Sequence, residues 1–241
     1  MNNFWVPTTT TPVRRDLKNT IGEGDVYNKI YKEINDHLEF DSHGCIYEVG
    51  NVMVRPGDIC VDAGANIGLW SMRAVKQGAS QVFSFEPTLK SFQCLCLNVA
   101  DMPMVHPFCM ALSGTRHMVY VPVNQDGDSA GSRLDNLEYR GYIKTPDLNL
   151  IYVTTLDELF DVGMFHKIDH LKLDVEGAER QILYGLSKER LRLVGKIVME
   201  YHRDERLKCE YHDMIMYLRQ SGFNHRFTLT TPAAEIITFE R

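Results

Sequence analysis

Ionisable residues alternate with apolar ones in the segment His-Leu-Lys-Leu-Asp-Val-Glu-Gly-Ala-Glu, residues 170–179. The period of two predicts a β-strand that carries Lys172 and Asp174 on one face. Further along the chain, Glu200 and His202 alternate with Met and Tyr in the same way. Carboxylate and imidazole groups in such positions can remove the proton of a hydroxyl group. We therefore predict one reactive site at the ends of two neighbouring strands.

Each of these four residues has an expected role. His202 is the first choice as base, because the ordinary pKa of histidine lies near neutrality. Asp174 is the second choice, either as base or as the group that orients the hydroxyl-bearing substrate. Glu200 would orient His202 or bind the substrate hydroxyl, and Lys172 would neutralise the carboxylates. A packed or solvated histidine is the alternative interpretation of His202.

A glycine-containing turn, Cys-Val-Asp-Ala-Gly-Ala-Asn-Ile-Gly at residues 60–68, lies between a predicted strand and a predicted helix. Gly64 and Gly68 permit a tight turn and a close approach of the backbone to a ligand. Asp62 would repel a pyrophosphate but can hold a cationic amine, and Glu86 at the next strand end can bind both ribose hydroxyls. S-adenosylmethionine has both a cationic amine and a ribose, so it fits these two acids. Alternatively, the two acids only cap the helices that follow them.

These residues require strands that end at one edge of a sheet. Strands are predicted at residues 45–54, 59–61, 81–85, 105–112, 117–123, 170–175, 196–201, 223–229 and 235–239. Helices are predicted at residues 27–38, 67–76, 88–99, 155–159, 178–186 and 211–220. The alternation of strands and helices predicts a parallel sheet covered on both faces, and the last two strands predict an antiparallel hairpin at one edge.

The predicted organisation is one α/β domain at residues 41–241, preceded by an N-terminal arm and helix at residues 1–40. Residues 1–25 lack periodicity and predict a mobile arm. Residues 124–150 have turn chemistry throughout and predict an irregular loop. Glu176 and Glu179 stand at the start of the predicted helix 178–186, where acids complement the helix dipole.

Composition limits the possible partners and location of the chain. The 241 residues carry a net charge of −6, which gives no general attraction to nucleic acid or to an anionic membrane. No apolar run approaches the ~20 residues needed to span a bilayer, and the start lacks the apolar middle of a signal peptide. The six cysteines include no CxxC pair. We therefore expect a cytoplasmic protein with reduced thiols and no structural zinc.

The order of these motifs resembles that of the FkbM-type methyltransferases, a branch of the S-adenosylmethionine-dependent enzymes. The matching segments lie at residues 56–58, 61–68, 85–87, 111–114, 155–159, 171–179 and 199–202. The resemblance implies a Rossmann-like class I methyltransferase fold and methyl transfer to a hydroxyl oxygen of a sugar, a glycan or a secondary metabolite. The block at residues 171–179 is the most specific to the family.

The resemblance also implies which residues surround the cofactor. The methionine end would be shaped by Asp62, Gly64, Ala65, Asn66 and Gly68. Glu86 would hold the ribose, the segment around Ala111 would flank the adenine, and Asp174 is also counted among the cofactor-binding residues. The acceptor remains open within the class of small molecules and glycans.

Other functions also fit parts of the sequence. Asp174, Glu200 and His202 could hold a divalent cation, but no spacing demands a metal. A grouping of lysine and acids also resembles RNA ribose 2′-O-methyltransferases, which the acidic net charge disfavours. A nicotinamide-dependent oxidoreductase is disfavoured by Asp62 and by the missing middle glycine of its fingerprint. A binding module without catalysis is the last alternative.

Overall fold

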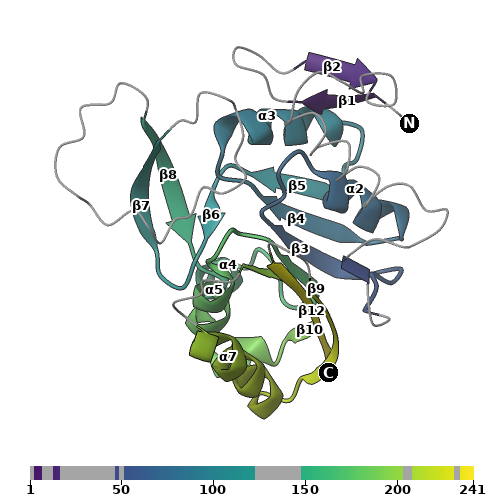
Figure 1. Ribbon diagram of the computed structural model, residues 1–241. Coiled ribbons are helices and arrows are strands. Elements are labelled where there is room, and N and C mark those ends of the chain that lie inside the picture. Colours follow the sequence, from purple (N-terminus) through teal and green to yellow (C-terminus); the bar gives the residue numbers. More distant parts are fainter. Residues whose placement is uncertain are drawn as a thin grey trace.

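The computed structural model describes residues 3–6, 13–16, 47–48, 52–122, 148–202, 208–230 and 234–241. Its centre is a seven-stranded sheet flanked by helices (Figure 1). From one edge to the other the strands are β11 (Asn224–Thr230), β12 (Ala234–Glu240), β10 (Val194–His202), β9 (Ile168–Leu173), β3 (Ile59–Ala63), β4 (Gln81–Phe85) and β5 (Val105–Phe108). The pairs from β10 to β5 are parallel, whereas β12 pairs antiparallel with both β10 and β11. The predicted parallel sheet with a C-terminal hairpin is confirmed.

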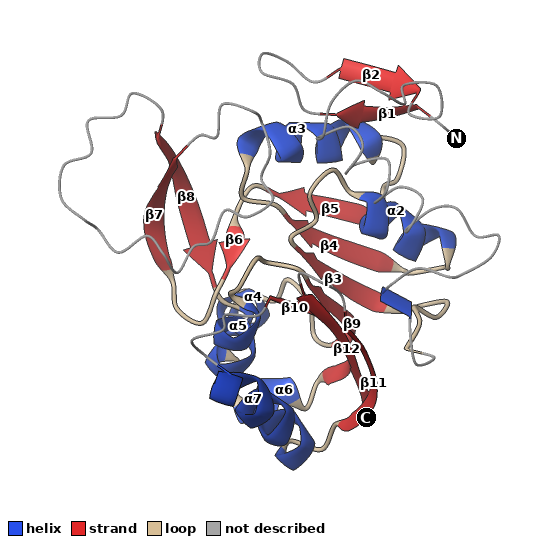
Figure 2. Cartoon of the chain, in the orientation of Figure 1, coloured by secondary structure: helices blue, strands red, loops and turns tan. Residues whose placement is uncertain are grey.

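Helices cover both faces of this sheet, and each face has its own apolar core (Figure 2). The helices are α2 (Leu69–Lys76), α3 (Leu89–Asn98), α4 (Leu156–Asp161), α5 (Glu179–Gly185), α6 (Lys188–Leu191) and α7 (Lys208–Gln220). Cys60 packs in the same cluster as Trp70 of α2, whereas the next residue, Val61, packs in the cluster that contains Leu183 of α5. Because alternate residues of β3 enter different cores, the strand is apolar on both faces.

A second, three-stranded sheet contains β6 (Ala111–Leu112), β8 (Leu148–Thr154) and β7 (His117–Pro122), in that order. The single strand predicted at residues 105–112 is therefore wrong: its first half is the edge strand β5 and its second half is β6. Pro107 lies in β5, where an edge strand tolerates a missing donor. The strand predicted at residues 117–123 is confirmed as β7. The first residues of β8 fall in the predicted loop 124–150, and the rest of that loop lies outside the described residues.

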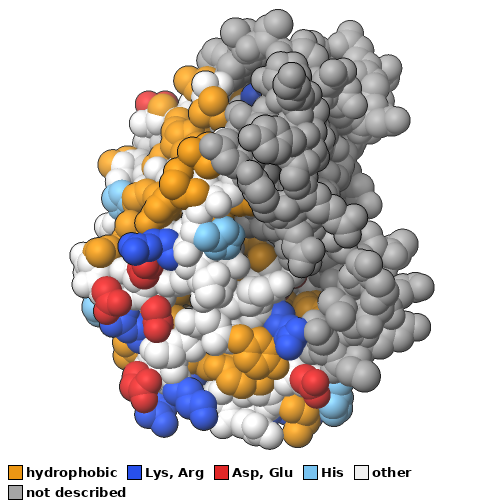
Figure 3. Space-filling view, turned by 90° about the vertical axis from the view of Figure 1, so that its left-hand side faces the viewer, with side chains coloured by type: hydrophobic (Ala, Val, Ile, Leu, Met, Phe, Trp, Pro, Cys, Tyr) orange, Lys and Arg blue, Asp and Glu red, His pale blue; other side chains and the backbone are white. Residues whose placement is uncertain are grey.

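The two faces of the second sheet differ in their packing. Ala111, Ile151 and Val153 form a small buried cluster on one face. On β7 and β8, Met118 is 59% exposed and Tyr152, its cross-strand partner, is 40% exposed. Figure 3 shows this side of the molecule, where hydrophobic side chains form a band.

The N-terminal region differs from its prediction. β1 (Asn3–Val6) and β2 (Val13–Asp16) form an antiparallel hairpin that lies against α3 (Figure 1). Four-residue strands are too short to show a clear period, so the sequence predicted only an arm. The strand predicted at residues 45–54 is also wrong in its described part, because residues 47–48 form a 3₁₀ turn and residues 52–55 are in no strand. The predicted helix 27–38 and the domain boundary at residue 41 lie outside the described residues.

Candidate active site

The turn that follows β3 is fixed by the two strands beside it. The N–H groups of Gly64 and Ala65 both donate to the carbonyl of Phe85 at 3.0 Å, and the Asp174 N–H donates to the carbonyl of Ala63 at 3.0 Å. Gly64 has φ +78°, and a Cβ atom there would lie 1.7 Å from the carbonyl oxygen of Asp174. Only glycine fits this position, because a side chain would collide with the backbone of the neighbouring strand end.

The same turn opens α2. Gly68 has φ +91°, and a Cβ atom there would lie 2.6 Å from the side chain of Leu95 in α3. Asn66 also has a positive φ, 48°, which asparagine tolerates better than most residues. Its backbone N–H is thereby directed to Glu86, to which it donates at 2.9 Å. The turn and the end of β4 form one hydrogen-bonded unit.

Glu86 lies at the carboxyl end of β4 and is 4% exposed. One carboxylate oxygen accepts the N–H of Asn66, and the other accepts the N–H of Thr88 at 2.7 Å. Burial raises the pKa of Glu86 from 4.5 to about 7, although the hydrogen bonds from Thr88 and Asn66 act in the opposite direction. Each carboxylate oxygen has a further lone pair, so the group can also accept hydrogen bonds from a ligand.

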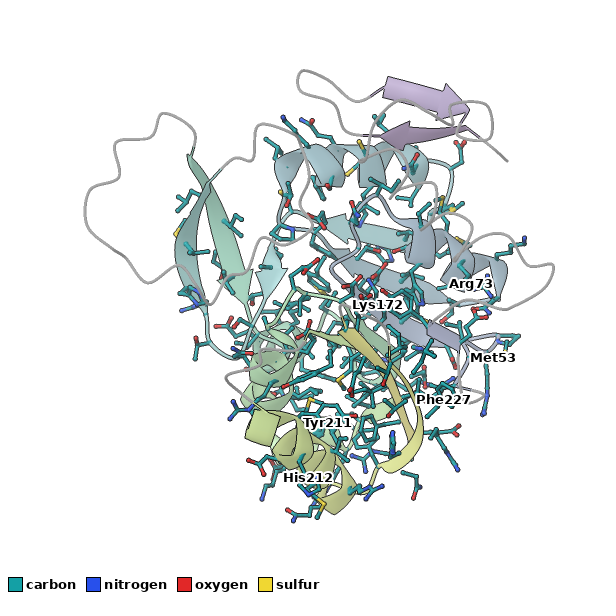
Figure 4. The ribbon with its side chains drawn as sticks, in the orientation of Figure 1. Met53, Arg73, Lys172, Tyr211, His212 and Phe227 are labelled. Atoms are coloured by element: carbon teal, nitrogen blue, oxygen red, sulfur yellow. The ribbon has the colours of Figure 1, made fainter. Side chains whose placement is uncertain are left out.

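Asp62 and Lys172 form a buried ion pair beneath the turn. They face each other in the register of β3 and β9, and Lys172 Nζ is 3.2 Å from Asp62 Oδ1. Ser71 of α2 donates its hydroxyl to the other Asp62 oxygen at 2.6 Å. Lys172 also donates to the carbonyl of Gly64 at 2.9 Å and lies 3.4 Å from Asp174 Oδ2. Figure 4 shows Lys172 near the centre of the molecule.

The charge of Lys172 is held by these acids. Burial alone would lower the pKa of Lys172, but the carboxylates of Asp62 and Asp174 outweigh burial and raise that pKa above its ordinary value. Lys172 therefore stays protonated and neutralises the two acids. The structure thus supplies the contacts for the neutralising role that the sequence predicted, and the role of Asp62 toward a cofactor amine stays a prediction.

Tyr47 is a site residue that the sequence analysis missed. Its hydroxyl lies 3.0 Å from Asp174 Oδ2 and 2.7 Å from Glu200 Oε2, and the residue is 2% exposed. Burial and the two neighbouring carboxylates raise the pKa of Tyr47 well above its ordinary value. A tyrosine in a segment predicted as a strand carries no chemical signature, so no feature of the sequence identified it.

The remaining predicted residues have different surroundings. Glu179 is buried at the start of α5, where its carboxylate accepts the N–H groups of Val175 and Gly177, so it acts within the turn before the helix. Ala111 is buried in β6, beyond the end of β5. His202 is the last residue of β10, opposite Ala234, and its side chain lies outside the described part of the structure.

The described residues give no independent support for a metal site. Among them, no group of three or more histidine, cysteine, aspartate or glutamate side chains is arranged to hold a metal ion. Within the same ranges, no helix has the length and apolar character that crossing a bilayer requires.

Comparison with known proteins places this geometry among methyltransferases. The family model described as the Methyltransferase FkbM domain matches residues 62–224. Methyltransferase sdnD of Sordaria araneosa is 31% identical over 201 residues, which are 71% of this chain and 73% of that protein. The 31-O-demethyl-FK506 methyltransferase FkbM of Streptomyces tacrolimicus is 24% identical over 219 residues, with 80% of each protein covered.

A solved structure agrees with the fold. Methyltransferase FkbM from Methylobacillus flagellatus KT has a TM-score of 0.56 to this chain at 16% identity. The match covers 90% of this chain and 52% of that one. This likeness confirms the predicted class I methyltransferase fold. Glu86, Lys172, Asp174 and Glu200 all lie inside the matched family region at residues 62–224, whereas Tyr47 lies outside it.

Proposed function

The chain belongs to the FkbM methyltransferase family, and from this premise we propose that it transfers a methyl group from S-adenosylmethionine to a hydroxyl oxygen. The proposed acceptor is a sugar, a glycan or a secondary metabolite. The relative named 31-O-demethyl-FK506 methyltransferase acts, by its name, at an oxygen of a small molecule. That name supports O-methylation as the reaction class for this chain.

The observation that carries the proposal is the carboxylate of Glu86 at the end of β4. It is held by two backbone N–H groups and retains lone pairs that suit the two hydroxyls of a ribose. In the adjacent turn, Gly64 lies against the backbone of Asp174, which leaves no room for a larger residue, and Gly68 lies against the side chain of Leu95. Ligands of open α/β sheets bind at this carboxyl edge. The acceptor group and the turn beside it therefore fit an adenosyl cofactor.

The bound cofactor would supply a methyl group on a positively charged sulfur. The protein must then orient the acceptor and take its proton. Asp174, whose side chain is 27% exposed, lies at the rim next to Lys172, and Glu200 lies at the end of the adjacent strand. We assign proton removal to this group of residues, with His202 of β10 as a further candidate base. No step of this scheme requires a metal ion.

Calorimetric titration of the full chain with S-adenosylmethionine tests the proposal. We expect binding, and we expect Glu86→Ala to weaken it by tenfold or more, since hydrogen bonds to a charged group contribute about 1.5–3 kcal/mol each. Glu189→Ala, which removes an exposed carboxylate of α6, is the matched control. Unchanged affinity in Glu86→Ala, or preferential binding of NAD, would contradict the assigned site.

A panel of hydroxyl compounds tests the acceptor class. Incubation with labelled cofactor and sugars, glycans or metabolite extracts, followed by mass spectrometry, should show a product that carries one added methyl group on oxygen. Methylation of RNA in the same panel, with no labelled small molecule or glycan, would instead support the ribose 2′-O-methyltransferase alternative.

A further inference from the structure

A single phenol oxygen lies between two carboxylates at the carboxyl ends of β9 and β10. Tyr47 Oη is within hydrogen-bonding distance of both Asp174 Oδ2, at 3.0 Å, and Glu200 Oε2, at 2.7 Å. Lys172 Nζ lies 3.4 Å from the same Asp174 oxygen and 5.3 Å from the centre of the Tyr47 ring. Side chains from three separate segments of the chain therefore meet at one point.

The phenol has one hydrogen for these two carboxylates. When it donates to Glu200, the Asp174 oxygen faces a lone pair of the phenol oxygen. That contact becomes a hydrogen bond only if the carboxyl of Asp174 carries a proton. Because burial and the two carboxylates raise the pKa of Tyr47 well above its ordinary value, the phenol keeps its own hydrogen at neutral pH. The group thus has a place for one more proton, and that place is on a carboxyl.

We propose that Tyr47 is a positioning residue that joins Asp174 and Glu200 into one proton-accepting unit for methyl transfer. Asp174 is the member that an acceptor can reach, since 27% of its side chain is exposed while Tyr47 is buried. This inference rests on the proposed methyltransferase function.

The proton balance follows from the contacts. A lone pair of the acceptor oxygen forms the new O–C bond, the S–C bond of the cofactor breaks with its electron pair left on sulfur, and the hydroxyl proton moves to Asp174. Protonated Asp174 then donates to Tyr47 Oη while Tyr47 donates to Glu200. Lys172 remains charged beside the pair. The released proton is therefore held in the contact between Asp174 and Tyr47.

Glu48, the residue after Tyr47, anchors this part of the chain to α2. The carboxylate of Glu48 accepts hydrogen bonds from Arg73 and Gln77, at the end of α2, and the side chain of Arg73 is 2% exposed. A buried ion pair of this kind is costly to break. Figure 4 shows Arg73 on the side of the molecule that carries α2. Tyr47 is thus held in place by a contact that does not involve the reacting groups.

The test uses the full chain without cofactor or acceptor. Aspartate and glutamate carboxyls carrying an isotope label are followed by NMR during a pH titration, and the signals are assigned with Asp174→Asn and Glu200→Gln. In Tyr47→Phe, protonated Asp174 loses the acceptor that Tyr47 provides, and ionised Glu200 loses the donor that Tyr47 provides. We expect the titration midpoint of Asp174 to fall and that of Glu200 to rise, each by about one pH unit, the equivalent of one hydrogen bond.

Opposite shifts distinguish this role from a structural one. If Tyr47 only filled space, Phe would fill the same space and neither midpoint would move, and that result would overturn the proposal. A shift of both midpoints in the same direction would overturn it as well. Tyr184→Phe is the control, because Tyr184 is 41% exposed and packs on Tyr217. It should move neither midpoint.

A second measurement covers the case in which Tyr47→Phe does not fold. In Glu200→Gln the phenol hydrogen becomes available to the charged Asp174 carboxylate and a neighbouring negative charge is removed, so both changes should lower the Asp174 midpoint. An unchanged Asp174 midpoint in Glu200→Gln would refute the proposal that Asp174 and Glu200 act as one unit. Neither titration involves S-adenosylmethionine. Midpoints that contradict the role of Tyr47 would therefore leave the proposed methyltransferase function standing. Conversely, a failure of cofactor binding would leave these titrations interpretable.

Discussion

Replacing Glu86 by Gln removes a buried charge and keeps the size of the side chain. Glu86 is 4% exposed, and burial raises its pKa from 4.5 to about 7. An acid whose pKa is raised in the folded state takes up a proton on folding. Its contribution to stability is complete below its unfolded pKa of about 4.5 and is lost as the pH rises through about 7. Gln does not titrate, so the variant should gain stability relative to the wild type across this window.

Two opposing contributions determine the size of the effect. The difference between 4.5 and about 7, at ~1.4 kcal/mol per pH unit, corresponds to about 3 kcal/mol of unfolding free energy. An opposing cost does not depend on pH. Glu86 accepts N–H groups from Asn66 and Thr88, whereas the amide of Gln can accept only one of them well, which costs about 1 kcal/mol. We therefore expect the variant to be about 1 kcal/mol less stable than the wild type in acid and about 2 kcal/mol more stable above neutrality.

Urea unfolding at a series of pH values, followed by tryptophan fluorescence, measures this difference. Other buried groups such as His170 titrate in both proteins, so their contribution cancels when the two curves are subtracted. Glu189→Gln, at an exposed position, should show a flat difference. Wild-type and Glu86→Gln curves that run parallel between about pH 5 and pH 8.5 would refute the claim that burial raises the pKa of Glu86.

The same variant should lose cofactor affinity while it gains stability. Gln replaces a charged acceptor by a neutral one, and we expect the Kd for S-adenosylmethionine to rise about tenfold. In the wild type, affinity should decline as the pH falls below about 7 and Glu86 becomes protonated. In Glu86→Gln, calorimetry should show no such decline. A stabilised variant that also bound the cofactor normally would separate Glu86 from the ligand.

Three further substitutions, with Gly163→Ala as a control, test the turn and the buried groups around the site. Gly64→Ala should destabilise the chain by more than about 3 kcal/mol, because its Cβ would lie 1.7 Å from the carbonyl oxygen of Asp174. Gly163 also has a positive φ, +72°, but open space around it, so Gly163→Ala should lower the free energy of unfolding by only about 1 kcal/mol. Burial lowers the pKa of His170 from 6.5 to about 3, so the contribution of the neutral imidazole to stability is present above about pH 6.5 and is lost as the pH falls. His170→Leu should therefore remove a slope of ~1.4 kcal/mol per pH unit from the unfolding free energy measured by urea titration in acid. An unchanged slope would contradict this. Lys172→Met leaves two acids without their cation and should cost about 3–5 kcal/mol; an unaltered melting temperature would show that they do not depend on it.

Local periodicity was sufficient to predict most of the central sheet. The strand at residues 81–85 was predicted with the bounds that β4 has in the structure, and the two strands of the C-terminal hairpin were placed to within a residue or two. The helix predicted at residues 155–159 corresponds to α4, and the hydroxyl of Thr155 caps it by accepting the N–H of Glu158. These features depend on residues close together in the chain, so the sequence contains their full signal.

Features that depend on tertiary contacts were not predictable in this way. The division of residues 105–112 between two sheets depends on the pairing of β6 with β8, whose residues lie far along the chain. The position of Tyr47 depends on Asp174 and Glu200, which are separated from it by most of the domain. Neither contact leaves a periodic or compositional trace, because each is created by the folded arrangement of distant segments.

The alternating ionisable residues His170, Lys172 and Asp174, in and just after β9, show why alternation alone could not distinguish a solvent-exposed face from a site. The strand is covered on both faces, so the surroundings of each residue depend on its depth along the strand. His170 is fully buried near Trp70. One step further, Lys172 is buried but paired with acids, and only Asp174 reaches the rim. A carboxylate can be both fixed by buried partners and reached by a ligand only where the strand ends, and that position is where the reactive group is expected.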